Sequence, residues 1–183
     1  MAVLDANVLY SAFGRDVLLR LAAAGLYRPL WTARIEAEWT GALLASRPDL
    51  TPAQLARTCA AMARAFPDAE VTGYEGLGAD LRLPDPDDRH VLAAAVATEA
   101  GEVVTWNLSD FPKAVLRPLG VEAVSPDAFV SSMLEANPDR VAAALRAHRT
   151  ELHSPPLTAA EYLGHMERAG LVTAANALRP ENL

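Results

Sequence analysis

Short apolar segments alternate with helical segments over the first two thirds of the chain, and this alternation constrains the fold more than any other feature. We expect buried strands at residues 2–5, 69–72, 102–105 and 121–124. Helices are expected at residues 15–25, 32–44, 51–66, 87–100 and near 109–118. Strands that alternate with helices favour a parallel sheet with helices on both faces, so the predicted class is α/β.

Residues that follow Ser125-Pro126 are expected to be purely helical. Asn137-Pro138 restarts a helix, and Thr158–Glu161 has the sequence of a capping box. We therefore divide the chain into an α/β domain at residues 1–125 and a helical extension at residues 126–183. The extension holds none of the candidate acids, so we expect it to support assembly or substrate access.

Composition excludes several classes of protein. A single cysteine, Cys59, rules out a disulfide framework and a multi-cysteine zinc site, and it is expected to be a small core residue. No apolar run approaches the roughly 20 residues of a membrane helix, and the N-terminus lacks the basic start of a signal peptide. We therefore expect a cytoplasmic protein without a membrane partner.

The net charge of −7 argues against a broad nucleic-acid-binding surface. Most of this charge lies in residues 51–110, which carry four Arg against ten Asp and Glu. An acidic protein can still bind a polyanion where bound divalent cations invert the local field. The simpler alternative is a solvated acidic surface, and composition does not separate the two.

Polar side chains follow the two strongest predicted strands. Asp5 ends the first strand in VLDANVL, and Asn107 and Asp110 follow the third in VVTWNLSDF. Ligands of an open parallel sheet bind beyond the carboxyl ends of its strands, so these residues should share one edge. Local alternatives remain open: Asp5 could form a turn, and Ser109 or Asp110 could cap the next helix.

The segment DPDDRHVLAAA offers three further acids, and helical geometry ranks them. Asp88 falls in line with the expected buried stripe of its helix, whereas Asp87 lies about 110° from the middle of that stripe and should be solvated. His90 lies about 160° from the stripe and is expected to face solvent. A buried acid costs free energy unless it is paired, hydrogen-bonded or metal-bound. Alternatively, the free N–H groups of the helix hold Asp88.

The helix in TARIEAEWTGALL carries two more acids. Glu36 and Glu38 flank its apolar face on opposite sides. Helical geometry therefore leaves both open as site residues.

Four segments together resemble the PIN-domain ribonucleases, and in particular the VapC-type toxins of bacterial toxin–antitoxin pairs. They are LDANVLYSA, IEAEW, DPDDRHVLAAA and VVTWNLSDF, within residues 2–125. The resemblance implies a PIN-like sheet and a catalytic cluster of Asp5, Glu38, Asp88 and Asp110, and it selects Glu38 over Glu36. Many relatives carry Asp at the position of Asn107, whose amide oxygen would ligate a cation more weakly than a carboxylate.

This resemblance implies metal-dependent chemistry. Crowded carboxylates raise one another's pKa unless a cation is present, and hard oxygen ligands select Mg²⁺ or Mn²⁺ over zinc. We expect an endoribonuclease that hydrolyses RNA with a metal-activated water. The expected ligands are the four catalytic acids and Asn107. We predict that the carboxylates of Asp5, Asp88 and Asp110 lie within a few Å of one shared Mg²⁺ position. Glu38 is expected to bind the cation through a water molecule.

Four residues are weaker candidates for contacts with RNA. Arg15, Arg34 and Arg89 would contact phosphates, and Trp106 would stack on a base. Each has a surface or packing role as its alternative.

The resemblance also implies a co-expressed antitoxin. We expect it to wrap the helices at residues 32–66 and to direct a basic side chain towards the acids, and we expect the chain to form a homodimer. Three rival functions remain, namely an aspartyl-nucleophile phosphatase, a non-catalytic protein-binding module and a structure-specific DNase. The phosphatase would require a second acid at the position of Asn7 and a lysine at the site, and Lys113 is the only lysine in the sequence.

Overall fold

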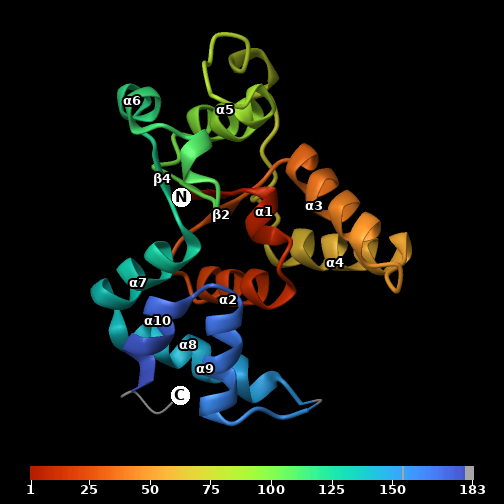
Figure 1. Cartoon of the computed structure of the whole chain (residues 1–183), viewed down its shortest axis with the longest axis vertical. Coiled ribbons are helices and arrows are strands. Elements are labelled where there is room, and N and C mark those ends of the chain that lie inside the picture. Colours follow the sequence, from red (N-terminus) through yellow and green to blue (C-terminus); the bar gives the residue numbers. More distant parts are fainter. Residues whose placement is uncertain (154, 180–183) are drawn as a thin grey trace. The chain divides into compact units, whose positions relative to one another are not determined.

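The computed structural model describes residues 1–153 and 155–179 and divides the chain into two compact units (Figure 1). The first unit comprises residues 1–10 and 28–124, and the second comprises residues 11–27 and 125–183. A boundary at residue 124 lies one residue from the predicted domain boundary. Residues 11–27 differ from the prediction, because they belong to the helical unit instead of the α/β unit.

A parallel sheet of four strands forms the centre of the first unit. Its strands lie in the order β2-β1-β3-β4, and they are β1 (Ala2–Leu4), β2 (Pro29–Leu30), β3 (Glu102–Val104) and β4 (Glu122–Val124). The predicted α/β class and three of the four predicted strands are therefore confirmed. The strand expected at residues 69–72 is wrong, since only Glu70 pairs there, in a single bridge with Trp31.

The central strand β1 is covered on both faces. Ala2, Val3 and Leu4 are all fully buried, and successive side chains of a strand point to opposite faces. Helices α5 (Arg89–Ala97) and α6 (Lys113–Leu116) pack against strands β1 and β3 and against strand β4, respectively. A sheet buried on both faces is typical of parallel α/β proteins.

The helices of the first unit begin where the sequence signals predict. Thr32 caps α3 (Ala33–Ser46), with its hydroxyl accepting from the N–H of Ile35. Thr51 and Gln54 form the predicted capping box at the start of α4 (Pro52–Ala65). Cys59, which we expected in the core, is only half-buried on α4.

The remaining elements of the first unit are short. They are α1 (Ala6–Leu9) and the 3₁₀ turns η1 (Glu75–Leu77), η2 (Pro86–Asp88), η3 (Leu108–Asp110) and η4 (Arg117–Leu119). The single helix expected near residues 109–118 is instead divided into η3, α6 and η4. Pro112 and Pro118 lack the N–H that a continuous helix would use, which accounts for the division.

Helix α5 is buried on all sides, which corrects one prediction. Six consecutive residues from His90 to Ala95 are buried, and His90 is 7% exposed instead of facing solvent. The reason is that η1 packs against α5. The helix is therefore covered on the side that its apolar stripe had left open.

In the described residues of the second unit the regular elements are helices, and His153 and Pro156 form a single bridge between α8 and α9. Its helices are α2 (Ala12–Ala23), α7 (Pro126–Ala136), α8 (Pro138–Glu151), α9 (Ala159–Arg168) and α10 (Val172–Leu178). The pairs α10 with α7, α10 with α9, and α2 with α8 pack closely. The predicted capping box at Thr158 and Glu161 is confirmed. None of the helices in the described part of the chain is long and apolar enough to cross a membrane.

Candidate active site

The strand order creates a crevice at one edge of the sheet. The chain passes from β1 to β2 on one side, while β3 lies on the other side of β1. The loops after β1 and β3 therefore diverge, and such a topological switch point is where open α/β sheets bind ligands. Because Leu4 pairs with Val104, Asp5 and Thr105 stand side by side at this point.

Hydrogen bonds hold Asp5 in a fixed position. Its Oδ2 accepts from the Thr105 hydroxyl at 2.7 Å and from the Asn7 amide nitrogen at 2.6 Å, and its Oδ1 accepts from the backbone N–H of Ala6 at 2.6 Å. Burial raises the pKa of Asp5, the hydrogen bonds oppose this rise, and the charge of Glu38 adds to it. Asp5 thus caps α1 and also presents a carboxylate at the crevice.

Asn7 and Thr105 were not among the predicted site residues. The Asn7 amide donates to the Thr105 hydroxyl at 3.0 Å and accepts from the N–H of Trp106 at 3.1 Å. Asn7 therefore ties the end of β1 to the end of β3. Two sequence signals could have found them: a polar residue directly after a buried strand, and an amide two residues after the strand-ending acid.

Asp88 is the point on which the other acids converge. Its half-buried carboxylate makes no capping hydrogen bond to α5, so the expected alternative that its own helix holds it is wrong. Burial, and then the charges of Asp5, Asp85, Asp110 and Glu38, raise the pKa of Asp88 to about 6. Four predicted acids from four separate elements therefore share one electrostatic environment, whereas Asp87 points into solvent as predicted.

Glu38 enters this environment from α3. Its Oε1 lies 3.0 Å from Arg34 Nε and 3.0 Å from His90 Nε2. Burial lowers the pKa of His90 to about 4, so its imidazole is neutral at pH 7 and donates through Nε2. Glu38 is among the charges that raise the pKa of Asp88, and Glu36 is not. His90 was missed because it was expected in solvent.

Asp110 and Asn107 lie in the loop after β3. Asp110 is half-buried on η3, and no side chain caps η3 or α6. The alternative of a capping role for Ser109 or Asp110 is therefore wrong. Asn107 is exposed, and Trp106 is 40% exposed. Both side chains are open to a ligand at the crevice.

The acids lie near one another without forming a complete coordination shell. Among the described residues, no group of three His, Cys, Asp or Glu is placed so that it could hold a metal ion. The predicted shared position for three direct carboxylate ligands is therefore not formed in this geometry. The donor set still fits a hard cation, because it consists of carboxylate oxygens whose mutual repulsion raises the pKa of Asp88.

A family model described as PIN domain matches residues 1–109. The chain belongs to the PIN-domain family. A second model, described as VapC50 C-terminal domain, matches residues 126–180. The protein described as "Putative ribonuclease VapC50" of Mycobacterium tuberculosis (strain ATCC 25618 / H37Rv) is 38% identical over 71 residues, which cover 39% of this chain and 42% of that relative. The match thus spans less than half of the relative's length. No solved structure matches the chain.

Two hollows of this PIN domain are lined by Glu38 or by the residues that contact it. One, of about 380 Å³, is lined by Asn7, Tyr10, Glu38 and Trp39 among others. The other, of about 270 Å³, is lined by the two residues that contact the Glu38 carboxylate, Arg34 and His90, and by residues of η1 and α5. Glu38 is therefore open to the first hollow and is linked to the second through Arg34 and His90.

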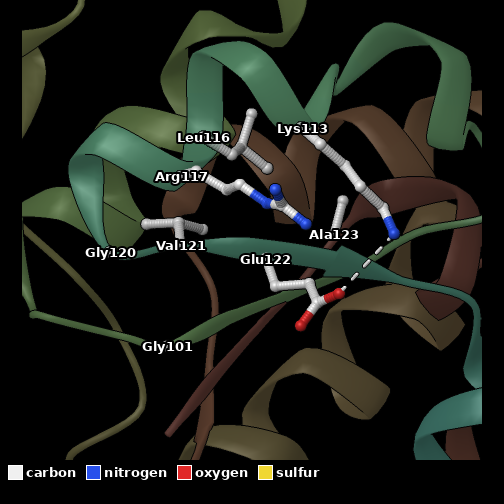
Figure 2. Close-up of a pocket in the computed structure, with 8 residues that line it drawn as sticks. All are labelled: Gly101, Lys113, Leu116, Arg117, Gly120, Val121, Glu122 and Ala123. Carbon is white, nitrogen blue, oxygen red and sulfur yellow. Dashed lines mark ion pairs between the residues drawn. The ribbon is translucent and has the colours of Figure 1, made fainter.

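A third hollow, of about 300 Å³, lies away from the acids. Figure 2 shows Lys113 and Arg117 reaching over it from α6 and η4, with Lys113 paired to Glu122 at 4.0 Å. Gly101 and Gly120 line it at the amino ends of β3 and β4, whereas the acids follow the carboxyl ends. The only lysine of the chain therefore cannot serve the acids, which removes the phosphatase alternative.

Arg15 belongs to the second unit. It is 7% exposed on α2. Its suggested contact with RNA stays a prediction.

Proposed function

We propose that this chain is a metal-dependent endoribonuclease and the toxin of a toxin–antitoxin pair. The observation that carries the proposal is the convergence of Asp5, Glu38 and Asp110 on the half-buried Asp88. The charge of Asp88 costs stability among these like charges, and its carboxylate makes no capping hydrogen bond in return. A protein-binding module would have no use for such a cluster, so the convergence favours catalysis.

The four acids would hold a divalent cation, Mg²⁺ or Mn²⁺, with Asn107 as a weaker oxygen ligand. When bound, the cation would lower the pKa of a water molecule and neutralise charge on the phosphodiester. The membership in the PIN-domain family and the name of the matched relative support RNA as the substrate.

The residues of the chain itself supply orientation and a proton acceptor. Thr105 and Asn7 fix the direction of the Asp5 carboxylate. Arg34 and His90 both contact Oε1 of Glu38, and Oε2 makes no hydrogen bond within the described residues. We infer that Oε2 accepts a proton from the attacking water. The exposed ring of Trp106 is available to stack on a base of the substrate.

The test is Mg²⁺-dependent cleavage of RNA by the purified chain. Asp5→Asn should abolish cleavage, because it removes the carboxylate charge but keeps the shape of the side chain. Asp68→Asn changes an exposed acid of the same unit and should leave the rate unchanged. Sequencing of 5′ ends in cellular RNA after induction would then locate the cut sites. Cleavage that survives Asp5→Asn would refute the proposed site.

The toxin proposal also requires a partner. We propose that a co-expressed antitoxin wraps α3 and α4 in the cytoplasm and places a basic side chain, Arg by preference, against the acids. Such a group would replace the charge of the cation and block the scissile phosphate. Co-purification from the native host should recover this protein, and the mass of the complex would test the expected homodimer. Repeated recovery of the chain alone, with growth unaffected by overexpression, would count against the toxin role.

A further inference from the structure

The hollow between α3, η1 and α5 carries a concentration of positive charge in the most acidic stretch of the chain. Arg34 and Arg89 line it, together with the neutral His90, Tyr74 and a single acid, Glu75. Residues 51–110 carry four Arg against ten Asp and Glu. Arg89 is the one arginine of this acidic stretch that lines the hollow, next to Arg34 from α3.

Arg89 has no counter-charge. It makes no hydrogen bond and no ion pair with any residue that the structure describes, and its Nε is buried without a partner. The half-buried guanidinium therefore carries a positive charge that no neighbouring acid pairs with, and an anion in the hollow would neutralise it. Arg34, in contrast, is already held by Glu38 and by the carbonyl of Asp87.

The hollow opens next to the catalytic acids. Arg34 and His90 each contact Oε1 of Glu38 at 3.0 Å, and both also line the hollow. These two side chains therefore connect the hollow to Glu38. Nδ1 of His90 is also buried and makes no hydrogen bond within the described part of the chain.

We propose that this hollow, which we call the Arg89 subsite, binds a phosphate of the RNA strand that neighbours the phosphate being cut. The inference rests on the ribonuclease function proposed above. A guanidinium matches the geometry of a phosphate with two parallel hydrogen bonds. A volume of about 270 Å³ is below the usual range for whole small-molecule ligands, so it suits a phosphate with its sugar and excludes a stacked base.

Glu75 gives the proposal a second, opposite prediction. Its exposed carboxylate lines the same hollow and repels a phosphate there. Removal of the charge of Glu75 should therefore strengthen binding, whereas removal of the charge of Arg89 should weaken it. A purely structural role of Arg89 predicts no such pair of opposite effects.

The experiment measures the affinity of the full chain for a short, fluorescein-labelled single-stranded RNA by anisotropy in Mg²⁺, over a series of salt concentrations. The Asp5→Asn background prevents cleavage during the measurement. Arg89→Gln should weaken binding about tenfold and reduce the slope of affinity against salt by about 0.7. Arg89→Lys should keep the slope, and Glu75→Gln should tighten binding. Arg57→Gln removes an exposed arginine outside the hollow and serves as the matched control.

The outcomes separate the subsite from the function. Equal effects of Arg89→Gln and Arg57→Gln, in a protein that cleaves RNA through Asp5, would overturn the subsite and leave the proposed function standing. A wild-type chain that neither binds nor cleaves RNA would overturn both. The double variant Arg89→Gln/Glu75→Gln tests whether Arg89→Gln weakens binding by misfolding. A misfolded protein would not bind RNA more tightly when Glu75→Gln is added. Tighter binding by the double variant than by Arg89→Gln alone therefore supports the subsite.

Discussion

Replacement of Asp88 by Asn should stabilise the metal-free protein at neutral pH, which is an unusual expectation for a member of the proposed catalytic cluster. Burial, together with the neighbouring charges of Asp5, Asp85, Asp110 and Glu38, raises the pKa of Asp88 from its ordinary value of 3.8 to about 6. The folded state therefore holds the proton more tightly than the unfolded state does. The contribution of Asp88 to the free energy of unfolding is therefore fully present below about pH 4, where the group is protonated in both states. This contribution is lost as the pH rises through about 6, where the folded state must ionise the group.

The magnitude follows from the displacement of the pKa. A rise from 3.8 to about 6 corresponds to about 3 kcal/mol if fully expressed. Water screens a half-buried group, so we expect about 1 kcal/mol of destabilisation in the wild type at neutral pH. Asn carries no charge and sacrifices no hydrogen bond, because Asp88 does not cap its helix. The variant should therefore gain this amount.

Denaturant unfolding in EDTA measures the effect. Asp88→Asn should exceed the wild type in free energy of unfolding at about pH 8 and match it at about pH 4. Asp87→Asn, one residue away with a side chain 91% exposed, is the control and should change neither value. Excess Mg²⁺ should stabilise the wild type more than the variant, because binding to the folded state adds to its stability. An Asp88→Asn protein that is less stable than the wild type at pH 8 in EDTA would refute the electrostatic account.

Two further predictions concern other parts of the chain. Thr105→Val should lower the free energy of unfolding by about 2 kcal/mol, because it removes a donor to the Asp5 carboxylate and leaves the N–H of Asn107 without its acceptor. Thr105→Ser keeps the hydroxyl and is the control. An equal loss of stability in both variants would exclude the hydrogen bonds as the cause. Truncation after Leu152 removes α9 and α10 and uncovers α7, so thermal unfolding or light scattering should show lower stability or a changed assembly, with metal binding retained. A truncated protein that stays soluble in its original assembly but no longer binds metal would contradict that division of roles.

The predictable part of the fold consists of elements whose signals are local. Buried parallel strands are continuous apolar runs, so β1, β3 and β4 were found, and the caps at Thr32 and Thr51 follow from side chains that reach their own helix. Strand β2 was missed because its two residues are too short to show a period. Residues 69–72 have the composition of a strand, but only Glu70 finds a partner.

Tertiary packing decided the remaining differences. The apolar stripe of α2 would suit either unit, and its contacts with α8 place it in the second. His90 was assigned to solvent because an amphipathic pattern assumes one covered face, whereas η1 covers the other face of α5. A covering segment without regular structure leaves no periodic signal, so sequence reasoning could not have found the contact between His90 and Glu38.

The site combines carboxylates that side chains hold, those of Asp5 and Glu38, with that of Asp88, which only its own elements position. Asp5 is held by three hydrogen bonds, and the one from Thr105 joins the end of β1 to the end of β3, 100 residues away in the sequence. Asp88 has no such bonds and is placed only by η2 and the start of α5. The resemblance to PIN-domain ribonucleases, and not spacing, selected Glu38. Strand ends and spacing predict only that Asp5 and Asp110 share one edge of the sheet, since topology alone brings strand ends together. They could not predict the rigidity of each acid, because that depends on Thr105, Asn7 and the neutral His90, whose roles arise only once the chain has folded.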